Sequence, residues 1–141
     1  MSDITTSIRK YLTGRTAVTD LVPADRIRPD VLKQNETMPA ITVRQFDSSH
    51  EHGLAGAAGL YESRVRVECY ADTRLESNAI AEAVRNQLQG FTGTMEADYV
   101  NDCLLDATAS DVDTPRDGSD RWRFRTRLTW RLFVQESIPT L

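Results

Sequence analysis

Four side chains with metal-binding character lie close together in the sequence: Asp47, His50, Glu51 and His52. A His-x-His pair flanked by carboxylates can hold a transition metal. The surrounding segment, residues 47–60, is rich in Gly and Ala and has neither helical nor strand periodicity, which is typical of a long mobile connection. Because no rigid element is predicted to hold the four side chains, we interpret them as a solvated polar loop rather than a metal site.

Templates for enzymatic chemistry are missing from the chain. The sequence contains no GxSxG, HExxH, GxxxxGK[ST] or GxGxxG motif. We therefore expect no catalytic residues, no cofactor and no bound metal, and we do not expect an enzyme.

A second polar segment contains Asp111, Asp113, Asp117 and Asp120 around Gly118, and this spacing superficially resembles a calcium loop. An EF-hand loop beginning at the first of these aspartates needs an oxygen ligand at its fifth position and Glu at its twelfth. The chain has Pro and Trp at those positions. Since Asp is a common turn residue, we interpret the segment as the acidic tip of a β-hairpin.

The most distinctive feature is a row of arginines near the C-terminus. Polar and apolar residues alternate over residues 121–134, so one face of a β-strand would carry Arg121, Arg123, Arg125, Arg127 and Arg131. Five like charges on one strand face repel one another unless acidic groups lie beside them. The polar positions of neighbouring amphipathic strands offer candidate partners, namely Glu62, Glu68, Asp102, Asp106 and Ser110.

Three interpretations of this Arg row stay open. It could be a solvated sheet face with cross-strand ion pairs, which are common, a subunit interface, or a nucleic-acid surface. The formal net charge of -4 and the lack of aromatic residues between the arginines argue against nucleic acid. The candidate interface residues are the five arginines with His50, His52, Asp111, Asp113 and Asp117.

Length and composition indicate one domain over residues 1–141. A chain of this length buries about 68% of the surface that its unfolded form exposes, which suffices for a core without disulfides or metals. The uncharged stretch at residues 53–61, like every other uncharged stretch of the chain, is far shorter than the ~20 residues that span a membrane. The N-terminus has no secretory signal, so synthesis and assembly in the cytoplasm are the default expectation. Cys69 and Cys103 are isolated in predicted strands and should be buried and reduced.

The hydrophobic pattern predicts the order helix, strand, strand, helix, strand, strand. The helices are expected at residues 4–12 and 73–90, with another turn or two at 16–22, and the strands at 40–46, 61–71, 100–110 and 121–134, with a short strand starting at 26–28. Thr73 and Glu76 form a capping box for the second long helix. The predicted fold class is α+β: a four-stranded, largely antiparallel or mixed sheet with two helices on one face and a long C-terminal β-hairpin.

Alternation along the strands also predicts which side chains face the core. In the strand at 100–110, every second residue from Cys103 to Ala109 should point inward. In the last strand, Trp122 and Trp130 should be core anchors rather than a stacking platform.

Several pieces of the chain, taken in order, carry a resemblance to a known family. They are Asp25-Arg26-Ile27 followed by Pro29, then Met38-Pro39-Ala40-Ile41-Thr42-Val43, the Gly-rich connection ending in Gly59-Leu60, the strand Arg64-Val65-Arg66-Val67-Glu68-Cys69-Tyr70-Ala71, and the helical stretch Ala79-Ile80-Ala81-Glu82-Ala83-Val84-Arg85 ending at Leu88 and Gly90. These pieces, which cover about half of the chain, resemble the small tailed-phage proteins called tail completion, tail terminator or head-to-tail joining proteins.

The resemblance implies a structural virion protein. It implies a ring, with six copies expected, that caps the head-proximal end of a phage tail tube and joins the tail to the head connector. The implied partners are other copies of the chain, the tail tube protein and the head connector or stopper protein, with DNA only passing through the ring. The alternative is a small ligand- or nucleic-acid-binding α+β domain, for which retention on DNA at low salt would be the distinguishing observation.

Overall fold

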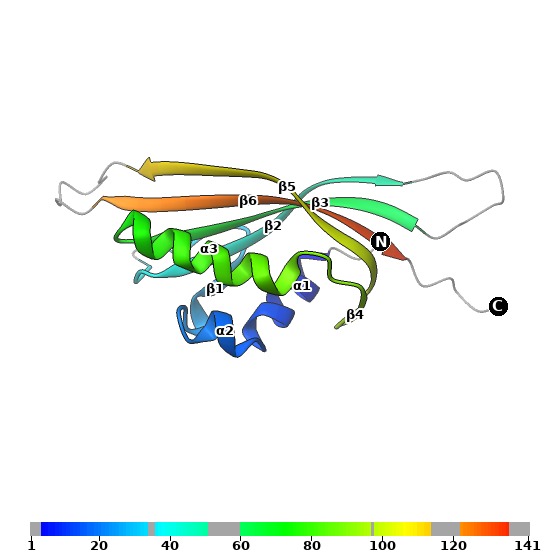
Figure 1. The fold of residues 1–141 in the computed structure, drawn as a ribbon, viewed down its shortest axis with the longest axis horizontal. Coiled ribbons are helices and arrows are strands. Elements are labelled where there is room, and N and C mark those ends of the chain that lie inside the picture. Colours follow the sequence, from blue (N-terminus) through cyan, green and yellow to red (C-terminus); the bar gives the residue numbers. More distant parts are fainter. Residues whose placement is uncertain (1–3, 34–35, 51–59, 97, 114–121, 136–141) are drawn as a thin grey trace.

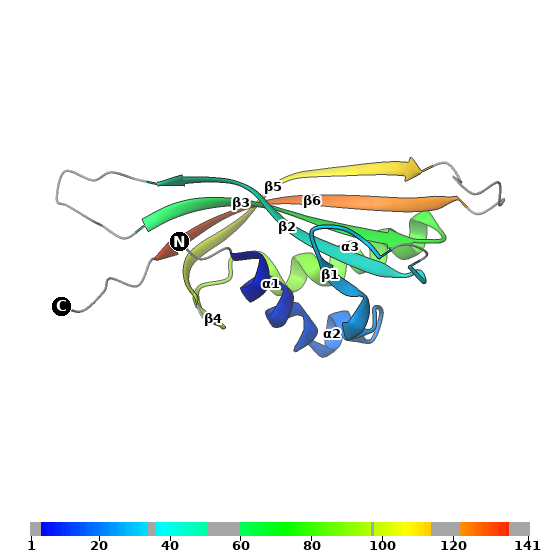
Figure 2. The same cartoon turned by 180° about the vertical axis from the view of Figure 1, so that it is seen from behind.

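The computed structural model describes residues 4–33, 36–50, 60–96, 98–113 and 122–135. In these residues, one six-stranded mixed sheet carries helices on one face (Figures 1 and 2). The strand order is β1-β2-β3-β6-β5-β4; β1 is parallel to β2, and the other neighbours are antiparallel. The prediction of a four-stranded sheet is therefore wrong, although the chain is α+β in general.

The helices and strands have the following bounds. The helices are α1 (Ile4–Thr13), α2 (Thr16–Thr19) and α3 (Arg74–Leu88), with a 3-10 turn, η1, at Ala24–Arg26. The strands are β1 (Ile27–Pro29), β2 (Ala40–His50), β3 (Leu60–Ala71), β4 (Gly93–Met95), β5 (Asp98–Asp113) and β6 (Arg123–Gln135).

The predicted four-stranded sheet leaves out the two edge strands, although the sequence does predict a short strand starting at 26–28, where β1 lies. Strands β1 and β4 contain three residues each, too few to show an alternating pattern. The sequence predicts residues 91–99 as a loop, and β4 lies within that segment. A short strand needs an existing neighbour to pair with, so its presence depends on tertiary structure rather than on local pattern.

The two longer helices form where the local signals predict them. Helix α1 buries Ile4, Ile8 and Leu12 completely and ends where the Gly14 N–H donates to the Lys10 carbonyl at 3.2 Å. Helix α3 begins after Thr73.

The helical layer covers only part of the sheet. In Figures 1 and 2, β2 and β3 extend beyond the helices at one end, whereas at the opposite end α3 reaches about as far as the β5–β6 hairpin. Strand β2 continues to His50, so residues 47–50 belong to a strand and not to the long connection predicted there. Residues 51–59 lie outside the described residues.

The β5 residues that point toward the helices change from odd-numbered to even-numbered part-way along the strand. A β-bulge lies between Leu105, which pairs with Trp130, and Ala107, which pairs with Thr129, so Asp106 is an extra residue. Beyond the bulge the alternation is inverted. The prediction that Ala107 and Ala109 face the core is therefore wrong, and both side chains are exposed.

The core lies between the helices and the sheet. Trp130 is completely buried there, as predicted. The same prediction for Trp122 is wrong, because its side chain is 50% exposed and it precedes the first residue of β6.

A buried polar network attaches α1 to the sheet. The Ser7 hydroxyl donates to Asp98 Oδ2 at 2.5 Å, and the Gln45 N–H donates to Thr5 Oγ1 at 2.9 Å. The Ser63 hydroxyl donates to Gln45 Oε1 at 2.9 Å. These bonds join α1 to β2, β3 and β5, so the helix position is set by directed bonds as well as by apolar packing.

Both cysteines are free and buried, as predicted. Burial raises the pKa of the Cys103 thiol to about 12, and burial also raises the pKa of the Cys69 thiol. The thiolate is the reactive form, so both residues should be inert at neutral pH.

The N-cap of α3 is a direct test of this fold. The Glu76 N–H donates to Thr73 Oγ1 at 3.2 Å, and removing such a cap typically costs about 1 kcal/mol. We expect Thr73→Ala to lower the free energy of unfolding by that amount in urea denaturation. Thr73→Ser keeps the hydroxyl and is the matched control; equal stability of the two variants would contradict the assigned cap.

Candidate functional site

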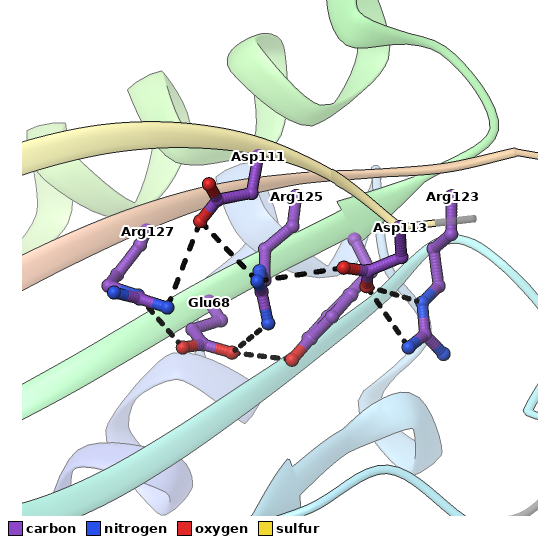
Figure 3. Close-up of polar contacts among 7 residues, drawn as sticks. Glu68, Asp111, Asp113, Arg123, Arg125 and Arg127 are labelled. Carbon is purple, nitrogen blue, oxygen red and sulfur yellow. Dashed lines mark hydrogen bonds and ion pairs between the residues drawn. The ribbon is translucent and has the colours of Figure 1, made fainter.

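The charged residues singled out in the sequence gather on the sheet face opposite the helices. Arg123, Arg125 and Arg127 occupy alternate positions of β6 and therefore share one face. Figure 3 shows them in a row with Glu68 of β3 and with Asp111 and Asp113 of β5. We call these six residues the charged cluster.

Glu68 lies between two of the arginines. Its Oε1 accepts a hydrogen bond from Arg127 Nε at 3.0 Å, and its Oε2 lies 3.6 Å from Arg125 Nη1. The Tyr70 hydroxyl also donates to Oε2. The Glu68 side chain is only 16% exposed, so its three partners replace most of the hydration that it loses.

The aspartates of β5 neutralise the same arginines from the other side of β6. Arg123 Nη2 lies 3.1 Å from Asp113 Oδ2, and Arg125 Nη2 lies 3.4 Å from Asp111 Oδ2 and 3.6 Å from Asp113 Oδ1. These contacts depend on the bulge at Leu105/Ala107, because without it Asp111 and Asp113 would fall on the helix side of β5.

A second group of ion pairs lies further along the same face. Arg131 Nε donates to Glu62 Oε1 at 2.7 Å, and Arg64 Nε lies 3.7 Å from the same oxygen. The hydrogen bond from Arg131 is the main cause that lowers the pKa of Glu62, with the Arg131 and Arg64 charges adding to it. The same bond raises the pKa of Arg131.

The predicted partners of the Arg row are partly correct. Glu62 and Glu68 are confirmed as ion-pair partners, and the charge of Asp106 acts on Arg131. Ser110, by contrast, pairs with Thr126 on the helix side, and the Asp102 carboxylate accepts the Cys103 N–H at 2.8 Å. Sequence alternation missed Asp111 and Asp113 as partners because a bulge leaves no pattern in the residues.

Two arginines next to the charged cluster carry no ion pair within the described ranges. Arg44 of β2 and Arg66 of β3 lie opposite each other in the register of the two strands. The Arg66 guanidinium stacks on the Phe46 ring, 4.3 Å from its centroid. Both arginines line a depression of about 590 Å³ on this face. Its cations come from Lys33, Arg44, Arg66, Arg123, Arg125 and Arg127, and its carboxylates from Asp30 and Glu68.

The other predicted site residues are placed only in part. His50 is the last residue of β2, whereas His52, Asp117 and Arg121 lie outside the described residues. Among the residues that the structure describes, no group of three or more His, Cys, Asp or Glu could hold a metal ion. No helix in the same ranges is long and apolar enough to cross a membrane.

Comparison with known proteins identifies the family. The model of the family described as "Tail completion protein gp17" matches residues 6–132, most of the chain. The protein belongs to this family. It is a structural component of a virion tail, and the predicted resemblance is confirmed.

A solved structure shares the fold of this tail completion protein. A chain of the structure titled "Virion of native gene transfer agent (GTA) particle" is 13% identical and superposes with a TM-score of 0.70, covering 94% of each chain. At this level of identity the likeness concerns the fold alone. No curated protein matches the sequence significantly.

The charged cluster predicts a stability effect of Glu68. Glu68→Gln removes the negative charge between Arg125 and Arg127, and Arg125 Nε already lacks a hydrogen-bond partner. We expect the free energy of unfolding to fall by about 1–3 kcal/mol. Glu82→Gln, on the exposed side of α3, is the control and should change stability little; an equally small effect of Glu68→Gln would refute the role given to this carboxylate.

The Arg131–Glu62 pair predicts a pH effect. The pKa of Glu62 is lowered on folding, so its contribution to stability is complete above the usual value of about 4.3 and disappears as the pH falls through the lowered pKa. Arg131→Met should raise the Glu62 pKa in an NMR titration of the carboxyl carbon. Arg44→Met should leave it unchanged; an unshifted Glu62 pKa in the Arg131 variant would contradict the assignment.

Proposed function

We propose that this protein forms a ring, with six copies as the expected number, at the head-proximal end of a tail tube. There it stops tube polymerisation and presents a surface to the head connector. The observation that carries the proposal is the family match over residues 6–132. The likeness in fold to a chain of a gene transfer agent virion is consistent with it.

The architecture supports a role that depends on self-association. The sheet has one face without helices, and its β2–β3 and β5–β6 arms extend in opposite directions (Figure 2). A protein that offers different surfaces at its two ends suits head-to-tail contacts, which close into a ring when the rotation between copies is right. We propose that Arg123, Arg125, Arg127 and Arg131, with Asp111 and Asp113, meet an adjoining subunit or virion component on the helix-free face.

The charge balance of the charged cluster supports DNA passage rather than DNA binding. In the cluster, three arginines are matched by three carboxylates, so few of its positive charges are free to hold phosphates. Tight phosphate contacts would slow DNA in transit. DNA is accordingly proposed to pass through the ring without being retained by it.

Deletion of the gene tests this function. Without the protein, we expect tails of uncontrolled length that are not joined to heads, because nothing caps the tube. Electron microscopy of lysates gives the tail-length distribution, and expression of the wild-type gene from a plasmid is the control. Infectious particles with normal tail lengths in the deletion strain would refute the proposal.

A further inference from the structure

The two longest outer edges of the sheet are only partly covered. Strand β1 pairs with Ile41–Val43 of β2, and no other described strand pairs with the rest of that outer edge. At the other side of the sheet, β4 pairs with Asp98, Tyr99 and Val100 of β5. Strand β2 has 11 residues and β5 has 16, so each extends well beyond its short edge strand.

The outer edge of β5 is tied to the rest of the molecule only near its start. The Gly90 N–H donates to the Cys103 carbonyl at 2.8 Å, and the Leu105 N–H donates to Gln89 Oε1 at 3.0 Å. Beyond Leu105, no described residue outside β6 hydrogen-bonds to the backbone of residues 106–113. Alternate backbone groups of these residues point away from β6 and can pair with another strand.

The side chains of β5 along this edge are also exposed on both faces of the sheet. The side chains from Asp106 to Ser110 are all exposed, and the four that follow Asp106 are small: Ala107, Thr108, Ala109 and Ser110. Another chain can therefore approach the backbone without steric obstruction. Long bare edges of this kind are normally covered or protected in native proteins, since they template pairing with another chain.

The outer edge of β2 has a similar free end. Its last contact in the described chain is at Gln45, whose N–H donates to Thr5 Oγ1 at 2.9 Å and whose Oε1 accepts the Ile4 N–H at 3.2 Å. In the part of the chain that the structure describes, residues 46–50 then continue β2 with a paired strand, β3, on one side only. The two free edges thus lie at opposite sides of one sheet and on arms that extend in opposite directions (Figure 1).

We propose that residues 106–113 of β5 in one copy pair with residues 46–50 of β2 in a second copy, which joins the sheets of neighbouring subunits. Each copy pairs through its β5 edge with one neighbour and through its β2 edge with another, so the contact repeats head to tail. The closure of this chain of contacts into a ring rests on the proposed function. The pairing itself rests on the two edges.

Charge favours this pairing over a two-fold contact between two β5 edges. Asp106, Asp111 and Asp113 of one copy would face the same aspartates of the other copy in a two-fold contact, and like charges opposed across strands are destabilising. On the β2 side, residues 46–50 carry one aspartate, Asp47, and the neighbouring cations Arg44 of β2 and Arg66 of β3 have no ion pair in the described ranges. The occupant that fits the β5 edge best is therefore β2 of a second copy.

Disulfide trapping in assembled particles tests the pairing. Ala109 and Asp47 both lie on the helix-free face, opposite Arg127 and Arg64 respectively, so the double variant Ala109→Cys/Asp47→Cys places cysteines where the two copies meet. Ala107→Cys/Asp47→Cys samples a register shifted by two residues. The native cysteines are buried and should not interfere. Mild oxidation should give a covalent ladder in multiples of the 15.9 kDa chain.

The controls separate the possible outcomes. Ala109→Cys alone should give no cross-link, and a dimer from it would show the two-fold contact instead. Ala109→Cys/Glu82→Cys places the second thiol on the exposed side of α3 and should give no ladder. If particles with normal, joined tails give no ladder with either test pair, the edge pairing is overturned while the capping function stands. Normal tails in the deletion strain would overturn the capping function alone.

Discussion

The helix-free face of the sheet depends on charge neutralisation across three strands. Alternate positions of β6 place Arg123, Arg125 and Arg127 side by side, an arrangement that is stable only with carboxylates on both flanks. Glu68 supplies one flank from β3, and Asp111 and Asp113 supply the other from β5. A single bulge at Asp106 brings the two aspartates to the correct face. The exposed sheet surface is therefore polar, ordered and close to neutral where the cluster lies.

This arrangement has a consequence for assembly. Because the arginines of the cluster are already paired within the chain, they are poor sites for gripping nucleic acid. Among the described residues, the groups without a strand or ion-pair partner lie elsewhere: the free backbone edges of β2 and β5, and the cations of Arg44 and Arg66. A structural protein of a virion tail needs surfaces that are satisfied only in the assembly, and these features meet that requirement.

Much of the fold could be predicted from local patterns. The long helices followed from the spacing of Ile4, Ile8 and Leu12 and from the cap at Thr73, and the four long strands followed from alternation. Of the two edge strands, β1 was expected as a short strand starting at residues 26–28, whereas β4 could not be predicted, because three residues carry no period and pair only when β5 is already in place. The bulge in β5 was equally invisible, and it reversed the predicted facing of Ala107 and Ala109. Trp122 was wrongly predicted to be buried, because the alternation of polar and apolar residues begins before the first residue of β6. The candidate site was found through its arginines, and Asp111 and Asp113 were already candidate interface residues, but their role as ion-pair partners of those arginines required the structure.

The most direct test of the account is a cryo-electron microscopy reconstruction of the junction between tail tube and head connector in native particles. The account predicts a closed ring of copies of this chain at the end of the tube, with β5 of each copy continuing the sheet of its neighbour at β2. A junction without this protein, or one that holds a single copy of it, would contradict the account.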